Sequence, residues 1–173
     1  VTEMSGPVAI RYPRGGEGAW TGLADVEGTS VVQEGDHITL VAYGTMVNQV
    51  LQAAQLLQQQ GYSAAVLKLN SIRPLDLGPV MQWAQRTGRL LVAEECNDTG
   101  SVGHTIAAEL ALQGKAVQMA LVNLGDGFVP QGSVAQLREM KGIDAEGICK
   151  KALEMIAGGE KEIGCTDGGP GAG

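Results

Sequence analysis

Two arginines close to the start of the chain have the type and spacing to bind an anion. They lie in the segment Gly6-Pro7-Val8-Ala9-Ile10-Arg11-Tyr12-Pro13-Arg14-Gly15. Pro13 restricts the backbone between Arg11 and Arg14, and Gly15 permits a sharp turn directly after them. A guanidinium on such a turn donates two parallel hydrogen bonds to a phosphate or a carboxylate. The segment is therefore a candidate anion site, although on spacing alone the favoured interpretation is an Arg-Pro loop that only ends a strand.

A second candidate for anion binding is the turn Gly44-Thr45-Met46, which joins a predicted buried strand to the N-terminus of a helix. The backbone N–H groups at helix N-termini bind anions. However, the turn has neither the G-x-G-x-x-G pattern nor a P-loop lysine. A structural turn is therefore the favoured interpretation.

Glu94 and Glu95 follow a predicted strand, at the edge where ligand clefts open in parallel sheets. Neighbouring residues of a strand point to opposite faces, so these two carboxylates do not form a paired acid and base. A strand end in contact with water is the favoured interpretation. A role for one of the two at an interface or toward a neighbouring domain is the alternative.

His104 begins a predicted helix, and the sequence assigns it no partner base or nucleophile, which favours a surface or helix-capping role. Cys96 is interpreted as a small packing residue, and the alternative is that a nearby helix N-terminus lowers its pKa. The three cysteines, Cys96, Cys149 and Cys165, are too few and too scattered for a disulfide framework or a zinc site. They indicate reduced thiols in the cytoplasm.

The composition argues against several classes of protein. A net charge of −7 argues against nucleic-acid binding, because phosphates need a basic surface, although one local cationic site remains compatible with it. No apolar run approaches the length of a membrane span, and no signal peptide is visible. Hydrophobic residues make up 44% of the chain and aromatic residues only 3%, so we expect a core of aliphatic side chains and methionine.

Short apolar runs alternate with helical patterns along the chain. Strands are predicted at Val8–Arg11, Val31–Gln33, Ile38–Tyr43, Ala64–Leu69, Arg89–Glu94 and Val117–Leu124. Helices are predicted from Thr45 to about Gln60, near Val80–Arg86, from Gly103 to about Gln113, after a Ser133 cap, and from an Asp144 cap to Ala157. Strand–helix–strand repeats need crossover connections. The pattern therefore predicts an α/β fold, a three-layer α/β/α arrangement with a mainly parallel sheet.

Taken in order, the motifs resemble the C-terminal part of the 1-deoxy-D-xylulose-5-phosphate synthase family, within the transketolase superfamily. The matching segments are Gly6–Gly15, Tyr43–Met46, Arg73–Asp76, Val92–Glu95, Phe128–Ser133 and Gly142–Ile148. They extend from Gly6 to near Ala157, and the first and last of them are the most specific. The middle segments are shared in looser form across the superfamily.

The resemblance implies a transketolase C-terminal domain over residues 23–157. The end of a pyrimidine-binding domain and a linker would precede it at residues 1–22, and a Gly-rich, disordered tail would follow at residues 158–173. The family is a cytoplasmic, homodimeric transferase that uses thiamine diphosphate and magnesium to join pyruvate to glyceraldehyde 3-phosphate with release of CO2. Its product serves isoprenoid and thiamine biosynthesis.

By the same resemblance, Arg14 matches the arginine that binds the substrate phosphate, and Arg11 and Tyr12 match motif positions as supporting residues. The ligands of the cofactor and of magnesium would all lie in upstream domains. We therefore expect this portion to contribute dimer contacts, to hold no catalytic, cofactor-binding or metal-binding residue, and to be inactive alone.

Two alternatives stay open at this point. One is the C-terminal domain of another transketolase or of a 2-oxo acid dehydrogenase β subunit, and the Arg-Tyr-Pro-Arg-Gly turn speaks against it. The other is a small-molecule-binding or interaction module with a Rossmann-like sheet. The missing glycine fingerprint argues against dinucleotides as its ligands.

Overall fold

The computed structural model describes residues 6–10 and 27–163, which hold five strands and five helices. The strands are β1 (Thr29–Gln33), β2 (Ile38–Ala42), β3 (Ala64–Leu69), β4 (Arg89–Ala93) and β5 (Gln118–Val122). The helices are α1 (Met46–Gln59), α2 (Gly78–Thr87), α3 (Val102–Leu112), α4 (Val134–Lys141) and α5 (Ala145–Ile163).

The strands form one sheet in the order β1-β3-β2-β4-β5. Strands β2 to β5 run parallel to one another, whereas the edge strand β1 pairs with β3 in the antiparallel direction. Strand β2 is buried along its whole length, which explains its nearly continuous apolar sequence. The prediction of a mainly parallel sheet is confirmed.

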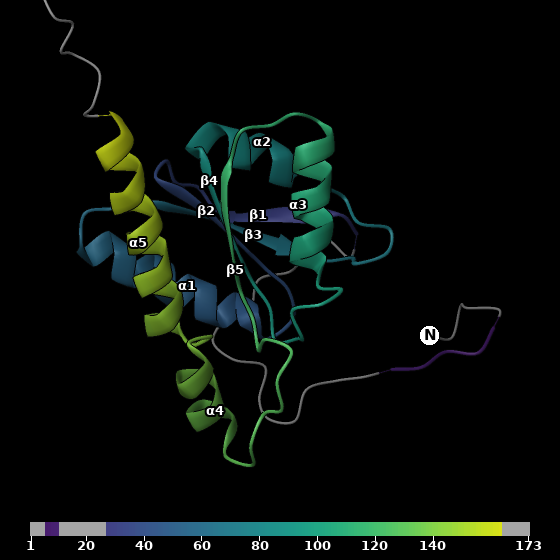
Figure 1. Cartoon of the computed structure of the whole chain (residues 1–173). Helices are drawn as coiled ribbons and strands as arrows, with labels where there is room; N and C mark the ends of the chain where they lie inside the picture. The colour runs from purple at the N-terminus through teal and green to yellow at the C-terminus, as the bar shows by residue number, and fades with distance from the viewer. Residues whose placement is uncertain (1–5, 11–26, 164–173) are drawn as a thin grey trace, which may run out of the picture.

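Helices cover both faces of the sheet (Figure 1). On one face, Leu57 of α1 and Ile148 of α5 share a hydrophobic core with Leu91 of β4. On the other face, helices α2 and α3 contribute to a second core, in which Ile106 lies with Leu90. The three-layer α/β/α arrangement and its aliphatic core are therefore confirmed.

Two predicted helix caps are also confirmed. The Ser133 side chain accepts a hydrogen bond from the backbone N–H of Gln136 at 3.3 Å and starts α4. The Asp144 carboxylate accepts one from the N–H of Gly147 at 3.0 Å and starts α5. Each cap supplies an acceptor for backbone N–H groups that a helix leaves unpaired at its start.

The prediction of a strand at Val8–Arg11 is wrong for the residues that the structure describes. Gly6–Ile10 is not part of a strand, and the side chains of Val8 and Ile10 are 40% and 66% exposed. A strand needs a neighbour that pairs with its N–H and C=O groups, and the described sheet offers none to this segment. Arg11 itself lies outside the described residues.

Helix α5 continues to Ile163, six residues past the predicted end at Ala157. The predicted tail therefore begins too early, because residues 158–163 are helical, while residues 164–173 lie outside the described part of the chain. Two glycines directly after Ala157 suggested an end to the helix. The Glu-Lys-Glu that follows them consists of good helix formers, and a glycine costs a helix only roughly 1 kcal/mol relative to alanine, so the helix continues through both glycines.

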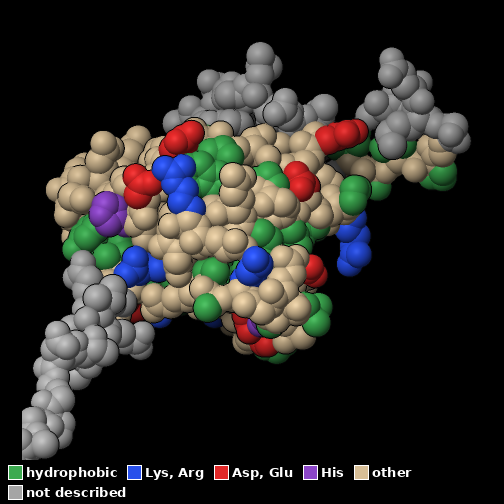
Figure 2. Space-filling view, turned by 90° about the horizontal axis from the view of Figure 1, so that it is seen from above, with side chains coloured by type: hydrophobic (Ala, Val, Ile, Leu, Met, Phe, Trp, Pro, Cys, Tyr) green, Lys and Arg blue, Asp and Glu red, His purple; other side chains and the backbone are tan. Residues whose placement is uncertain are grey.

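The surface carries acidic and basic side chains side by side, and the face seen in Figure 2 shows no broad basic patch. Among the described residues, no helix combines the length and the apolar character needed to cross a membrane. The carboxyl ends of strands β2 to β5 meet at one edge of the sheet, at the lower end in Figure 1, where α4 also lies. Ligand clefts of parallel sheets open at this edge, so the search for a site begins there.

Candidate functional site

The predicted anion site at the start of the chain lies beyond the described residues. Arg11, Tyr12 and Arg14 all fall in the segment 11–26, for which the structure gives no placement. Their role in binding an anion therefore stays a prediction. Among the described residues, the carboxyl edge of the sheet is the place where ligand clefts of parallel sheets open.

Glu94 is the centre of this edge, and its side chain is completely buried. Its Oε1 accepts a hydrogen bond from the N–H of Gly103 at 2.8 Å, and its Oε2 accepts one from the N–H of Val102 at 3.0 Å. The hydroxyl of Tyr43 donates to Oε2 at 3.1 Å, and the thiol of Cys96 lies 3.7 Å from the same oxygen. The carboxylate thus lies at the positive end of the α3 dipole and satisfies the free N–H groups there.

The favoured interpretation of Glu94 as a solvent-exposed residue at the end of a strand is therefore wrong. The reason is tertiary, because α3 begins directly over the end of β4, and no local pattern reports that placement. The sequence contained one signal of this close contact, which is the glycine at position 103 in the first turn of the predicted helix. A Cβ at this position would come within 2.9 Å of Oε1 of Glu94 and would collide with the Leu121 side chain, so glycine permits the close approach.

Glu94 raises the pKa of two neighbouring groups. Burial, followed by the charge of Glu94, holds the pKa of Tyr43 far above its ordinary value. Burial and the same charge also raise the pKa of the Cys96 thiol. The alternative that a helix N-terminus activates Cys96 is thus wrong, because Glu94 occupies that N-terminus. A thiol with a raised pKa is a poor nucleophile.

Glu95 interacts with a different helix. Arg138 of α4 donates a hydrogen bond from Nη2 to Glu95 and another, at 3.0 Å, to the hydroxyl of Thr45. The two glutamates therefore do not form an acid–base pair, as the alternation of strand residues predicted. The turn at Thr45 is linked to α4 by this arginine, in agreement with a structural turn. Sequence reasoning did not identify Arg138, because it is one of several charged residues on a short surface helix.

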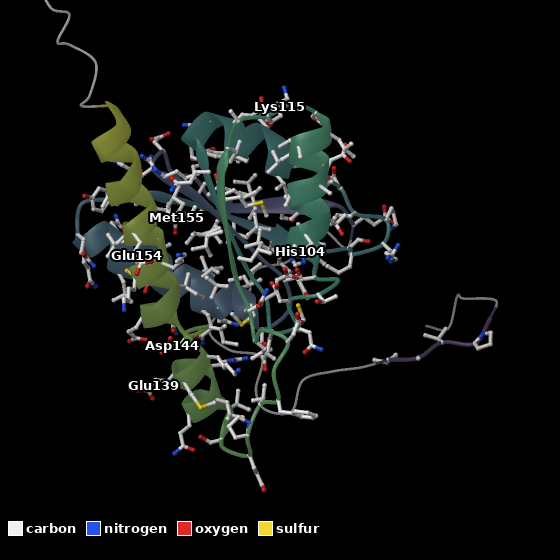
Figure 3. All side chains as sticks on the ribbon, in the orientation of Figure 1. His104, Lys115, Glu139, Asp144, Glu154 and Met155 are labelled. Carbon is white, nitrogen blue, oxygen red and sulfur yellow. The ribbon has the colours of Figure 1, made fainter. Side chains whose placement is uncertain are left out.

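His104 lies in the first turn of α3, at the end of the helix nearest the carboxyl edge (Figure 3). Its side chain is 48% exposed, with Nε2 at 3.8 Å from a carboxylate oxygen of Asp98. The hydroxyl of Ser101, and not His104, caps the helix by accepting from the His104 N–H. The surface position is confirmed, and the capping role belongs to Ser101.

The loops that follow β4 and β5 are tied together beside His104. Asn123 donates to Asp98 at 2.7 Å, and the backbone N–H and hydroxyl of Thr99 donate to Asp126 at 2.9 and 2.7 Å. These hydrogen bonds from Thr99 lower the pKa of Asp126. The carboxyl edge is therefore acidic and held in place by the chain's own residues.

The chain is similar to a known protein family and to individual known proteins. The family model described as Transketolase, C-terminal domain, matches residues 28–148. A 1-deoxy-D-xylulose-5-phosphate synthase of Heliobacterium modesticaldum is 34% identical over 163 residues, covering 88% of this chain and 24% of that protein. The 1-deoxy-D-xylulose-5-phosphate synthase 1 of Geobacter sulfurreducens is 38% identical over 161 residues, covering 88% and 25%. The chain thus spans about a quarter of the length of these relatives.

Two solved structures are similar in fold. One, described as "Split gene transketolase, inactive beta4 tetramer", has a TM-score of 0.67 and 27% identity, covering 75% of this chain and 41% of that chain. A transketolase variant from Pichia stipitis has a TM-score of 0.53 and 20% identity, covering 75% and 18%. The second likeness concerns the fold alone.

Replacing Glu94 by glutamine is expected to destabilise the chain by about 1.5–3 kcal/mol, the range for a hydrogen bond to a charged group. The amide offers one acceptor where the carboxylate offers two, so its NH₂ would face an N–H donor of α3. Urea unfolding of the chain measures this loss. The matched control is Glu95→Gln, whose partly exposed ion pair is expected to contribute about 1 kcal/mol or less. Equal losses in both variants would contradict the role given to Glu94.

Alkylation of Cys96 by iodoacetamide is expected to be slow at pH 8 and to keep accelerating above the ordinary pKa of a thiol. A raised pKa leaves less thiolate at any given pH, and the thiolate is the species that reacts. Glu94→Gln removes a negative charge beside the sulfur and is expected to shift the pH profile downward. Mass spectrometry of the Cys96 peptide follows the rate. An unchanged profile in the variant would show that Glu94 does not act on this thiol.

Proposed function

The chain belongs to the transketolase C-terminal domain family, and on this premise we propose that it is the C-terminal part of a 1-deoxy-D-xylulose-5-phosphate synthase. The observation that carries this proposal is the identity of 34–38% to such synthases over 88% of the chain. The whole enzyme would join pyruvate to glyceraldehyde 3-phosphate, releasing CO2 and forming 1-deoxy-D-xylulose 5-phosphate. That product would supply isoprenoid and thiamine biosynthesis.

The described residues do not fit thiamine diphosphate and its magnesium ion. The carboxyl edge presents Glu95, Asp98 and Asp126, which would repel a diphosphate, and its guanidinium at Arg138 is already paired with Glu95. The described part of the chain also has no group of three or more His, Cys, Asp or Glu side chains placed to hold a metal. We assign the cofactor and the metal to upstream domains and expect this chain to be inactive without them.

Arg14 is proposed to bind the phosphate of glyceraldehyde 3-phosphate, with Arg11 and Tyr12 supporting it. An acidic sheet edge repels a phosphate, so the described carboxyl edge is a poor candidate for this role. The guanidinium of Arg14 on a proline-restricted turn has suitable geometry for this. Residues 6–10 are exposed and lie outside the sheet, which is in keeping with residues 1–22 belonging to the preceding pyrimidine-binding domain. Residues 23–157 would then form the C-terminal domain.

The whole enzyme is proposed to be a cytoplasmic homodimer to which this domain contributes contacts. These assignments rest on the resemblance to the family. Two free thiols, Cys96 and Cys149, agree with a reducing compartment.

An assay of the intact enzyme tests the proposed function. The gene is first sequenced upstream of the Val1 codon, and the thiamine-binding region is expressed with this chain, either as one polypeptide or as two. Pyruvate and glyceraldehyde 3-phosphate are expected to give 1-deoxy-D-xylulose 5-phosphate. Transfer from a ketose phosphate in place of pyruvate would identify a transketolase, and activity independent of a phosphosugar would identify a 2-oxo acid dehydrogenase. Either result would overturn the proposal.

Substitution of Arg14 by lysine in the intact enzyme is expected to raise the KM for glyceraldehyde 3-phosphate and leave the KM for pyruvate nearly unchanged. Loss of a charge-assisted, two-pronged hydrogen bond costs about 1.5–3 kcal/mol, which corresponds to a roughly 10- to 150-fold change. Steady-state kinetics with each substrate varied in turn measures both constants.

The control for this variant is Arg86→Lys, because Arg86 lies on α2 and pairs with Asp36 at 2.7 Å, with a half-exposed side chain. Both KM values are expected to stay at the wild-type level in this control. If Arg14→Lys leaves the KM for glyceraldehyde 3-phosphate unchanged, Arg14 does not bind the phosphate.

A further inference from the structure

The two edges of the sheet differ in how they are protected against further strand pairing. At one edge, β1 pairs irregularly with β3, with a shift of register between Val31 and Gln33. At the other edge, β5 keeps a regular register with β4 over its whole length, and its sequence Gln-Met-Ala-Leu-Val contains neither a charge nor a proline. Edge strands are usually protected by bulges, charges or proline. The outer edge of β5 has none of these features.

The hydrogen bonds of β5 identify which of its residues face outward. The N–H of Gln118 donates and the C=O of Val122 accepts on the side of β4, at 3.0 and 2.9 Å. Because successive residues of a strand direct their backbone groups to opposite edges, the N–H and C=O groups of Met119, Leu121 and Asn123 point away from β4. No strand of the described chain pairs with them, and no other element crosses in front of β5 in Figure 1.

A basic hollow of about 500 Å³ lies beside this edge, between the end of β5 and helices α4 and α5. The charged side chains that line it are Lys141, Lys150, Lys151 and Glu154, so three lysines and one glutamate leave a net charge of +2. Lys151 donates to Glu154 at 3.3 Å. Lys141 and Lys150 have no ion pair within the described residues. The hollow is therefore a local cationic surface on a chain of net charge −7.

The acidic side chains of neighbouring segments are not paired with these lysines. Asp126, just beyond β5, accepts hydrogen bonds from Thr99 on the loop after β4. Glu139 and Glu146 line a different hollow, which Gln49 of α1 also borders. The basic hollow thus keeps its positive charge although the carboxyl edge of the sheet is acidic.

The two faces of β5 offer different surfaces to a strand added at its edge. Ala120 and Val122 pack against the core formed with α1 and α5, which is the side of the lysines on α5. Met119 and Leu121 pack against the core on the opposite face, and all four side chains are only partly buried. Side chains of an added strand would alternate between these faces. Those on the first face would meet ammonium groups, and those on the second would meet apolar side chains.

We propose that the outer edge of β5 binds an extended, acidic segment of another protein as a sixth strand of the sheet. Main-chain hydrogen bonds to Met119, Leu121 and Asn123 supply affinity, as in other cases of strand addition. Carboxylates opposite Lys141 and Lys150 select the partner by charge. The segment therefore alternates acidic and apolar residues. This inference goes beyond the proposed function and does not depend on it.

The composition of β5 favours another protein over a second copy of this chain. Two copies could pair their β5 strands about a twofold axis, because each edge presents the same groups. However, β5 contains no Asp or Glu, so the paired strand would bring no carboxylate to the lysines. An acidic segment satisfies both the open backbone groups and the unpaired ammonium groups.

Binding of a labelled peptide tests the proposal on the chain expressed with its upstream region. The probe is fluorescein-labelled Val-Glu-Val-Glu-Val-Glu-Val, and the matched control probe has Lys in place of each Glu. Fluorescence anisotropy is expected to show saturable binding of the acidic peptide and none of the basic one. Hydrogen exchange resolved to single amides is expected to slow at Met119, Leu121 and Asn123 when the acidic peptide is bound.

N-methylated peptides separate strand addition from attraction by charge alone. A strand directs only every second N–H toward its neighbour, so methylation at every Val or at every Glu is expected to abolish binding in one case only. Equal binding of both methylated peptides would overturn the proposal, because the backbone would then play no part.

Lysine variants test the basic hollow. Lys150→Gln is expected to weaken binding of the acidic peptide about threefold, and Lys141→Gln combined with it about tenfold, since exposed ion pairs are individually weak. The matched control is Arg73→Gln, because Arg73 is exposed on the loop after β3, and β2 and β4 lie between β3 and β5 in the sheet. This control is expected to bind the peptide like the wild type.

Failure of the acidic peptide to bind would overturn the proposal. So would slow exchange at the three outward amides before any peptide is added, since a second copy or another part of the enzyme would then already cover the edge. Synthase activity plays no part in these measurements, so a failed synthase assay would refute only the proposed function.

Discussion

The carboxyl edge of the sheet depends on the buried carboxylate of Glu94. A charge removed from water is tolerated only where donors replace the water, and here the N-terminus of α3 and the hydroxyl of Tyr43 provide them. The interaction connects the end of β4 with the start of the next helix and with the residue after β2. Gly103 allows the contact, since any side chain there would collide with Leu121. The positions of three elements at this edge therefore follow from one carboxylate.

This arrangement has a consequence for where a substrate can bind. In open parallel sheets, helix N-termini at the carboxyl edge commonly bind the phosphates of ligands. Here Glu94 occupies the N-terminus of α3. Arg138 of α4, which donates to Thr45 just before α1, is already paired with Glu95. At α3 the domain thus uses its own carboxylate to satisfy the position that would otherwise hold an anion, so this N-terminus is not available to a phosphate.

Sequence reasoning predicted the elements whose signals are local. Short stretches of sequence were enough to predict the apolar strands β2, β3 and β4 and the caps Ser133 and Asp144. The structure has these elements where they were expected. Sequence reasoning failed where the outcome depends on distant parts of the chain. Val8 and Ile10 look like a strand, but a strand forms only beside a partner. Glu94 looks like a surface residue, and only the placement of α3 shows that it is buried.

The segment Phe128–Ser133 contains residues whose identity the fold of this domain explains and one residue whose identity it does not. Its second half serves the domain, since Ser133 caps α4 and a Cβ on Gly132 would come within 3.2 Å of the Leu137 side chain. Phe128, in the first half, is fully exposed and buries no apolar surface within the described domain. Burial within this fold therefore accounts for the serine and the glycine but not for the phenylalanine.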